Sequence, residues 1–181
     1  MAAIINTAHE PLVSVEEYIA RFAEGDEKPR CEYVDGELFP KPMPTKAHSK
    51  AQMNIGFAIR TRWPEQFDPL PELTTRLHET QFFIPDIAVE DKAKPVAGRY
   101  PGPNNPVFLC VEILSPPDRI GKLMAKCEEY HRWGVPYCWI VDPERKKAWE
   151  YLPQDREPRA AETQLTAGPI ALPLAEVFEG I

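Results

Sequence analysis

Two acids and a lysine stand out in this sequence because of the residues that surround them. Glu112 is the one charged residue in the apolar run 107–114, and Asp86 is the one acid in the apolar run 82–89. A carboxylate in a buried strand is costly unless it is paired, protonated or bound to a metal. Lys126 follows in a segment with helical periodicity. These residue types suggest a metal site with a lysine beside it.

The two acids provide the ligands that a hard divalent cation prefers. Asp86 and Glu112 lie 26 residues apart, and their carboxylates can converge if the two strands are neighbours. Two carboxylates, water and a backbone carbonyl, for which Ile113 is well placed, suit Mg²⁺ or Mn²⁺ equally. A structural ion pair of Glu112 with Lys126 or Arg119 would explain the same residues without chemistry. Both readings stay open at this point.

The role of the lysine depends on helix geometry. At about 100° per residue, the helix predicted after Glu112 has one apolar stripe, formed by Leu123, Cys127, Tyr130 and Gly134. Lys126 lies on the border of this stripe, so its stem can follow apolar surface while its ammonium reaches the edge of a site. There it would balance the acids, orient a water or stabilise a phosphate. Asp118 is expected to cap the helix.

The segments before this region predict helices and strands in alternation. Ser14 and Glu17 form a capping box, and Asp35-Gly36 suits a two-residue hairpin turn. The predicted elements are a short helix from Ser14 to about Glu24, a hairpin at 31–39, a helix at about 45–62, and strands at 72–78 and 81–90. We expect the proline-rich segment 64–71 to be a loop. His48 is expected at the surface, and Glu32 is expected to be an exposed strand charge unless the hairpin packs over the site.

The remaining segments complete a mixed sheet with helices on it. Residues 91–106 predict a long loop that could serve as a flap over the site. Strands are predicted at 137–141 and 147–152. The fold class is therefore α/β (α+β), in one domain over residues 1–181, with a core at about 12–152 and a C-terminal extension at 153–181.

Composition limits the classes of function. The net charge of −7 means that nucleic acid would need a local basic patch, for which Arg119, Lys122 and Arg132 are candidates. The cysteines show no zinc-like spacing and are expected to be reduced core residues; they are Cys31, Cys110, Cys127 and Cys138. No signal peptide or membrane-spanning stretch is apparent, so we expect a cytoplasmic protein with no membrane partner.

The order and spacing of several short motifs resemble the restriction-endonuclease-like proteins of the Uma family, a branch of the PD-(D/E)XK nuclease superfamily. The resembling stretches are EYVDGEL at 32–38, AHS at 47–49, PDIAV at 85–89, VEILSP at 111–116, KCEEY at 126–130 and GVPYCWIVDP at 134–143. The resemblance covers roughly residues 12–152. It implies a restriction-endonuclease-like core with a mixed central sheet, flanking helices, and an N-terminal helix and hairpin.

The resemblance also implies an activity, which is metal-dependent hydrolysis of a phosphodiester in DNA. Asp86 and Glu112 match the two acids of the superfamily pattern, while Leu114 stands where that pattern has its lysine. Lys126, on the following predicted helix, is the position that corresponds to the displaced lysine. Glu32 corresponds to an acid that lies upstream in the family's pattern. Two alternatives remain, namely a catalytically inactive nuclease-fold module that binds nucleic acid or a protein, and a structural homodimer formed through an exposed strand edge.

Overall fold

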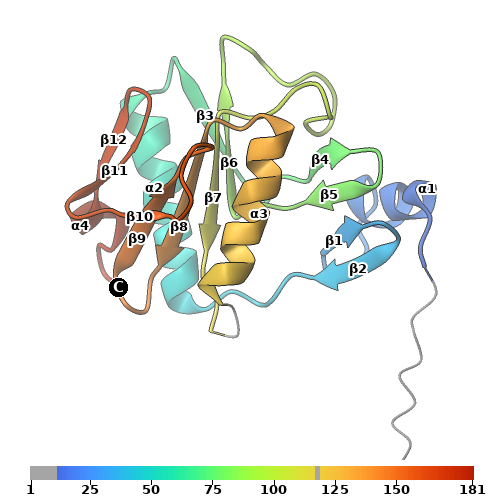
Figure 1. Ribbon diagram of the computed structural model, residues 1–181, viewed down its shortest axis with the longest axis horizontal. Coiled ribbons are helices and arrows are strands. Elements are labelled where there is room, and N and C mark those ends of the chain that lie inside the picture. The colour runs from blue at the N-terminus through green and yellow to red at the C-terminus, as the bar shows by residue number, and fades with distance from the viewer. Residues whose placement is uncertain (1–11, 117–118) are drawn as a thin grey trace, which may run out of the picture.

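The computed structural model describes residues 12–116 and 119–181, and its centre is a six-stranded sheet in the order β10-β9-β8-β7-β6-β3 (Figure 1). The strands are β3 (Phe67–Pro71), β6 (Ile87–Asp91), β7 (Leu109–Ile113), β8 (Tyr137–Asp142), β9 (Lys147–Tyr151) and β10 (Arg159–Ala160). β7 and β8 are parallel and the other neighbours are antiparallel, so the predicted mixed sheet is confirmed.

A four-stranded antiparallel sheet in the order β2-β1-β5-β4 lies beside the central sheet (Figure 1). Its strands are β1 (Cys31–Val34), β2 (Glu37–Pro40), β4 (Thr75–His78) and β5 (Gln81–Phe83). Asp35 and Gly36 have φ of 49° and 99°, as a tight hairpin turn requires. A further hairpin, β11 (Gln164–Ala167) and β12 (Ile170–Pro173), follows near the C-terminus.

Four helical segments complete the described part of the chain. They are α1 (Val15–Tyr18) continued by a π-helical turn η1 (Ile19–Ala23), α2 (Lys46–Arg62), α3 (Ile120–Trp133) and α4 (Leu174–Val177). Ser14 and Thr45 accept N-terminal backbone N–H groups of α1 and α2, which satisfies donors that a helix leaves unpaired. Arg119 is at the N-cap position of α3, and Asp118, the expected cap, lies outside the described residues.

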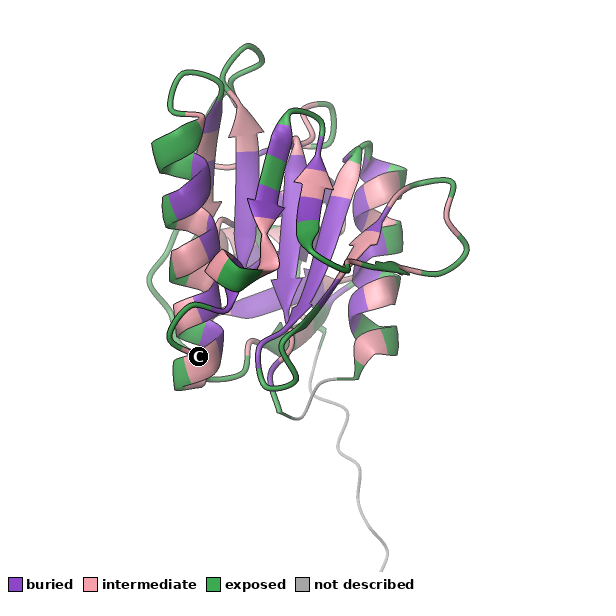
Figure 2. Ribbon diagram, turned by 90° about the vertical axis from the view of Figure 1, so that its left-hand side faces the viewer, coloured by how far each residue is buried: buried purple, intermediate pink, exposed green. Residues whose placement is uncertain are grey.

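The two long helices cover opposite faces of the central sheet, which is buried between them (Figure 2). The core on the α2 face includes Ile55, Val111 and Trp139, while α3 packs on the other face through Cys127 and Tyr130. All four cysteines are buried, and none of them is in a disulfide. This division assigns the side chains of β7 alternately to α2 and α3.

The C-terminal segment contributes to the core on the α2 face. The side chains of Leu165, Ile170, Leu172 and Val177 are fully buried in the same cluster as those of α2. The hydrophobic core therefore extends well beyond residue 152, where the sequence suggested an extension.

Three expectations about elements are wrong. Residues 67–71 form the edge strand β3, where prolines are tolerated because one side of the strand has no partner. The strand expected at 81–90 is divided around Pro85 into β5 and β6, which belong to different sheets. The loop at 91–106 joins the end of β6 to the start of β7, so it lies at the opposite end of these strands from Asp86 and Glu112 (Figure 1). It cannot act as a flap over them.

Candidate active site

Asp86 and Glu112 meet across two neighbouring strands. Ile87 of β6 pairs with Val111 of β7 in an antiparallel register, so one further step places Asp86 opposite Glu112. Both acids are buried. The backbone N–H of Ile113 donates to Oδ2 of Asp86 at 2.7 Å. Because the N–H and C=O of one strand residue point to the same side, the Ile113 carbonyl also faces the Asp86 side.

Lys126 connects a third acid to this pair. Its Nζ lies 2.7 Å from Oε1 of Glu32 and 2.7 Å from Oε1 of Glu112. Glu32 also accepts the backbone N–H of Ile84 at 2.9 Å, and Tyr130 donates its hydroxyl to Oε1 of Glu112 at 2.6 Å. Both Lys126 and Tyr130 contact Glu112 through its Oε1. The ion pair considered from the sequence is therefore present.

A second set of partners surrounds Asp86. Nζ of Lys41 lies 2.7 Å from Oδ1, and Nε2 of His48 lies 3.3 Å from Oδ2. Gln52, one turn after His48 on α2, donates to the backbone carbonyl of Asp86 at 2.7 Å. His48 is only 4% exposed, and its Nδ1 has no hydrogen-bond partner among the described residues. The expectation of a surface histidine is wrong, because the first turn of α2 packs against the start of β6.

These side chains line one small pocket. It is bordered by the three acids, by Lys41, Lys126 and His48, and by the prolines that follow β2. The space between them measures about 40 Å³, comparable with the volume of a water molecule or two. The pocket can therefore admit an ion with water but no nucleotide, and a phosphate would have to approach at its mouth.

The two acids of the strand pair have opposite pKa shifts. Burial would raise the pKa of Asp86, but the hydrogen bond from His48 and the charge of Lys41 outweigh it and hold this pKa well below its usual range. Burial raises the pKa of Glu112 above its ordinary 4.5, and the charge of Asp86 adds to this effect while Lys126 opposes it. Burial would lower the pKa of Lys126, but Glu112 and Glu32 outweigh it and raise it. Lys126 stays charged, and Glu112 is the acid whose ionisation is opposed.

Because the ionisation of Glu112 is opposed, we predict that its charge lowers the free energy of unfolding of the metal-free protein. When folding raises the pKa of a carboxyl group, the folded state is favoured at pH values below the pKa of the unfolded state. This contribution to the free energy of unfolding is lost as the pH rises through the pKa of the folded state. In EDTA, Glu112→Gln should therefore have a larger free energy of unfolding than wild type at neutral pH, and the difference should vanish below pH 4.5. Urea unfolding at several pH values measures it. A variant less stable than wild type at neutral pH would identify Glu112–Lys126 as a stabilising structural pair.

The donors that meet at this point are two carboxylates and a backbone carbonyl, which are oxygen ligands of the kind that a hard divalent cation takes. No group of three or more His, Cys, Asp or Glu side chains in the described ranges is arranged to hold a metal ion. Mg²⁺ is commonly bound by one or two carboxylates, with water and substrate phosphate completing its shell. Asp86, Glu112 and the carbonyl of Ile113 are all oxygen ligands of this kind.

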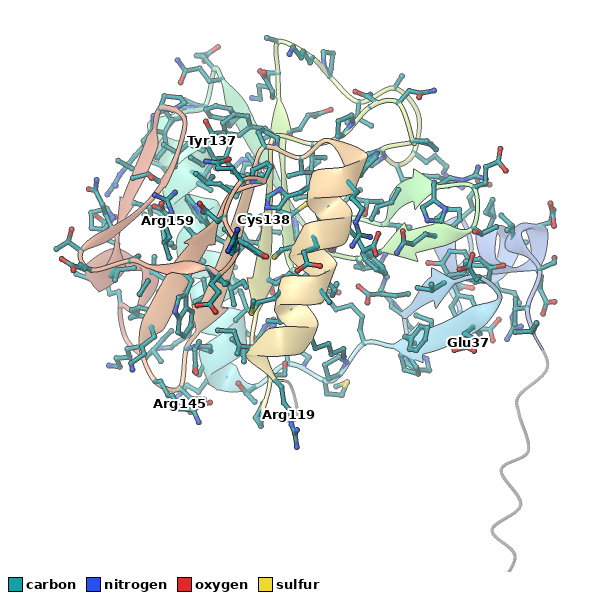
Figure 3. The ribbon with its side chains drawn as sticks, viewed as in Figure 1. Glu37, Arg119, Tyr137, Cys138, Arg145 and Arg159 are labelled. Carbon is teal, nitrogen blue, oxygen red and sulfur yellow. The ribbon has the colours of Figure 1, made fainter. Side chains whose placement is uncertain are left out.

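The structure thus brings together the residues selected from the sequence and adds others. Glu32, Asp86, Glu112 and Lys126 border one pocket, so Glu32 is not an exposed strand charge but faces the pocket, as the alternative for it required. Among the basic candidates, Arg132 forms ion pairs with Glu128 and Glu129 near the end of α3, and Lys122 lines the pocket. Arg119 extends outward from the start of α3 (Figure 3).

Lys41, His48 and Tyr130 were missed by sequence reasoning as members of the site. His48 had a signal, because it lies within the AHS motif at the start of α2. Tyr130 also had one, since it falls in the KCEEY stretch, but the helical stripe assigned it to the core alone. Lys41 had none, because the PKPMP segment that carries it shows no periodicity.

Comparisons with known proteins agree with this architecture. A sequence model of the Uma2 family, described as "Putative restriction endonuclease", matches residues 15–181. A crystal structure of "a putative nuclease belonging to DUF820" from Anabaena variabilis ATCC 29413 superposes with a TM-score of 0.75 and 21% identity, covering 92% of this chain and 97% of that chain. At that identity the likeness shows the fold alone. No curated protein matches the chain. Within the described part of the chain, none of the helices has the length and hydrophobicity to cross a bilayer.

Proposed function

The chain belongs to the Uma2 family of restriction-endonuclease-like proteins, and from this premise we propose that it hydrolyses phosphodiester bonds in DNA with the help of Mg²⁺ or Mn²⁺. The observation that carries the proposal is the convergence of two buried acids where β6 begins and β7 ends. Asp86 and Glu112 lie beside the carbonyl side of Ile113, with Lys126 at hydrogen-bonding distance from Glu112. Two carboxylates buried side by side are costly even when each has a lysine partner, so their convergence favours a role beyond packing.

Each residue of the site would have a separate role in hydrolysis. Asp86, Glu112 and the Ile113 carbonyl would hold the metal, which when bound polarises a phosphoryl oxygen and lowers the pKa of a water ligand. Lys126 presents a fixed positive charge, because its pKa is raised by the two acids that flank it. It orients the attacking water or stabilises the charge that develops on the phosphate. Glu32 holds the Lys126 ammonium in place at 2.7 Å, and Tyr130 orients Glu112.

Metal binding provides the first test, and it needs no DNA substrate. Calorimetric titration of wild type with Mg²⁺ or Mn²⁺ should show one site, and Glu112→Gln should lose it because one of two anionic ligands becomes a neutral amide. Glu90→Gln, which changes an acid near the far end of β6, is the matched control and should bind as wild type does. Wild type that takes up neither metal at millimolar concentration contradicts the proposal.

One observation favours a second function, a nuclease-fold module without activity. Both acids of the strand pair already have a lysine partner at 2.7 Å, and Leu114 occupies the position of the usual lysine. A module of this kind would bind DNA in a salt-dependent manner without divalent metal. Binding of a labelled duplex in EDTA, combined with a flat metal titration, would select this alternative.

A further inference from the structure

Lys41 occupies one oxygen of an acid that the proposed function requires for metal. It follows directly after β2, and its Nζ lies 2.7 Å from Oδ1 of Asp86 and 2.7 Å from the carbonyl oxygen of Ile84. An ammonium at this distance fills the position that a cation would take on Oδ1. Both cannot be held there at once, since their like charges would repel each other.

The two oxygens of Asp86 have different surroundings. Oδ2 accepts the backbone N–H of Ile113 at 2.7 Å and lies 3.3 Å from His48, so its partners belong to a strand of the central sheet and to the helix α2. Oδ1 has its ion pair with the side chain of Lys41. Oδ1 is therefore the oxygen that can change its partner without any change in the backbone.

Lys41 also differs from Lys126 in its freedom to move. The main chain of Lys41 is anchored, because its N–H donates to the carbonyl of Arg30 at 2.9 Å and prolines precede and follow it. Its side chain is 14% exposed at the rim of the pocket, whereas that of Lys126 is held between two buried acids. A flexible four-carbon stem on an anchored backbone allows the ammonium to leave Asp86 and remain at the pocket mouth.

We propose that Lys41 is an exchangeable counter-ion of the metal site. In the metal-free protein it neutralises Oδ1 of Asp86, and when the metal binds it moves to the mouth and contacts a phosphate of the DNA strand. This inference rests on the proposed function and adds to it a residue that couples metal loading to substrate binding. The exchange leaves Asp86 paired with a cation in either state, which limits the cost of burying its carboxylate.

The test compares metal affinity in variants without DNA present. Lys41→Met should bind Mn²⁺ roughly tenfold more tightly than wild type, the factor that loss of one competing charge-assisted hydrogen bond is worth. Lys122→Met removes the same charge from the same pocket lining and serves as the control for a general electrostatic effect. Lys41→Gln keeps a hydrogen-bond donor without the charge, and it should show an intermediate gain if Lys41→Met does not fold.

The outcomes separate this inference from the proposed function. If wild type binds Mn²⁺ and Lys41→Met binds it no more tightly than Lys122→Met does, the exchange is refuted while the metal site stands. If wild type binds no Mn²⁺, both are refuted.

A second measurement concerns DNA, since Lys41→Met should lower the salt dependence of duplex binding in Ca²⁺ by about one phosphate contact. An unchanged slope would show that Lys41 does not reach the phosphate.

Discussion

Asp86→Asn and Glu112→Gln should each lower Mg²⁺-dependent cleavage of duplex DNA by roughly a thousandfold or more. Metal polarisation of a phosphoryl oxygen is worth several kcal/mol in the transition state, and each ~1.4 kcal/mol changes a rate about tenfold. Both substitutions replace the carboxylate that would bind the metal with a neutral amide of the same shape. Loss of supercoiled plasmid over time, with saturating Mg²⁺ and with EDTA, measures the effect.

The controls for this prediction separate chemistry from folding. Glu90→Gln should cleave at the wild-type rate, because Glu90 lies near the end of β6 remote from Asp86. Circular dichroism and the unfolding midpoint of each variant show whether the fold persists. Wild-type cleavage in both Asp86→Asn and Glu112→Gln would rule out the mechanism proposed for these acids.

Lys126→Met should lower the free energy of unfolding by about 3–5 kcal/mol, the cost of leaving a buried charge without its partner. Its ammonium lies 2.7 Å from Glu32 and 2.7 Å from Glu112, and all three side chains are almost completely buried. The methionine fills a similar volume, so the loss reports the charge rather than a cavity. Urea unfolding at neutral pH in EDTA measures it.

Two further variants make this result interpretable. Lys122→Met, one turn earlier and exposed, should change stability by less than about 0.5 kcal/mol, as surface substitutions usually do. Adding Glu112→Gln to Lys126→Met should restore part of the loss, because one of the two unpaired acids is then neutral. If Lys126→Met were as stable as wild type, water would have to reach Glu32 and Glu112. The buried ion pair would then no longer support the proposal that Lys126 holds a fixed positive charge.

Much of the fold was predictable because its signals are local. Periodicity located α2, α3, β8 and β9, and the Asp35-Gly36 turn located the hairpin of β1 and β2. The failures have a physical cause in each case. Prolines concealed β3, because an edge strand tolerates them, and Pro85 divided a single apolar run between two sheets.

For the site, the sequence by itself determined which acids are anomalous and that a helix carrying Lys126 follows Glu112. These facts need only the identity of neighbouring residues, since a lone carboxylate in an apolar run is unusual wherever the strand lies. The sequence did not determine whether Glu112 has a structural or a chemical role. It left that choice open because an ion pair with Lys126 fits both.

Only the tertiary structure decided which groups face the two acids. The register of β6 and β7 set Asp86 opposite Glu112, and the packing of α2 and the β2 hairpin brought His48 and Lys41 to Asp86. Lys41 lies 45 positions from Asp86 in a segment without periodicity, so no local pattern could link them. Contacts of this kind arise from how sheets and helices pack, and they gave Asp86 and Glu112 their opposite pKa shifts.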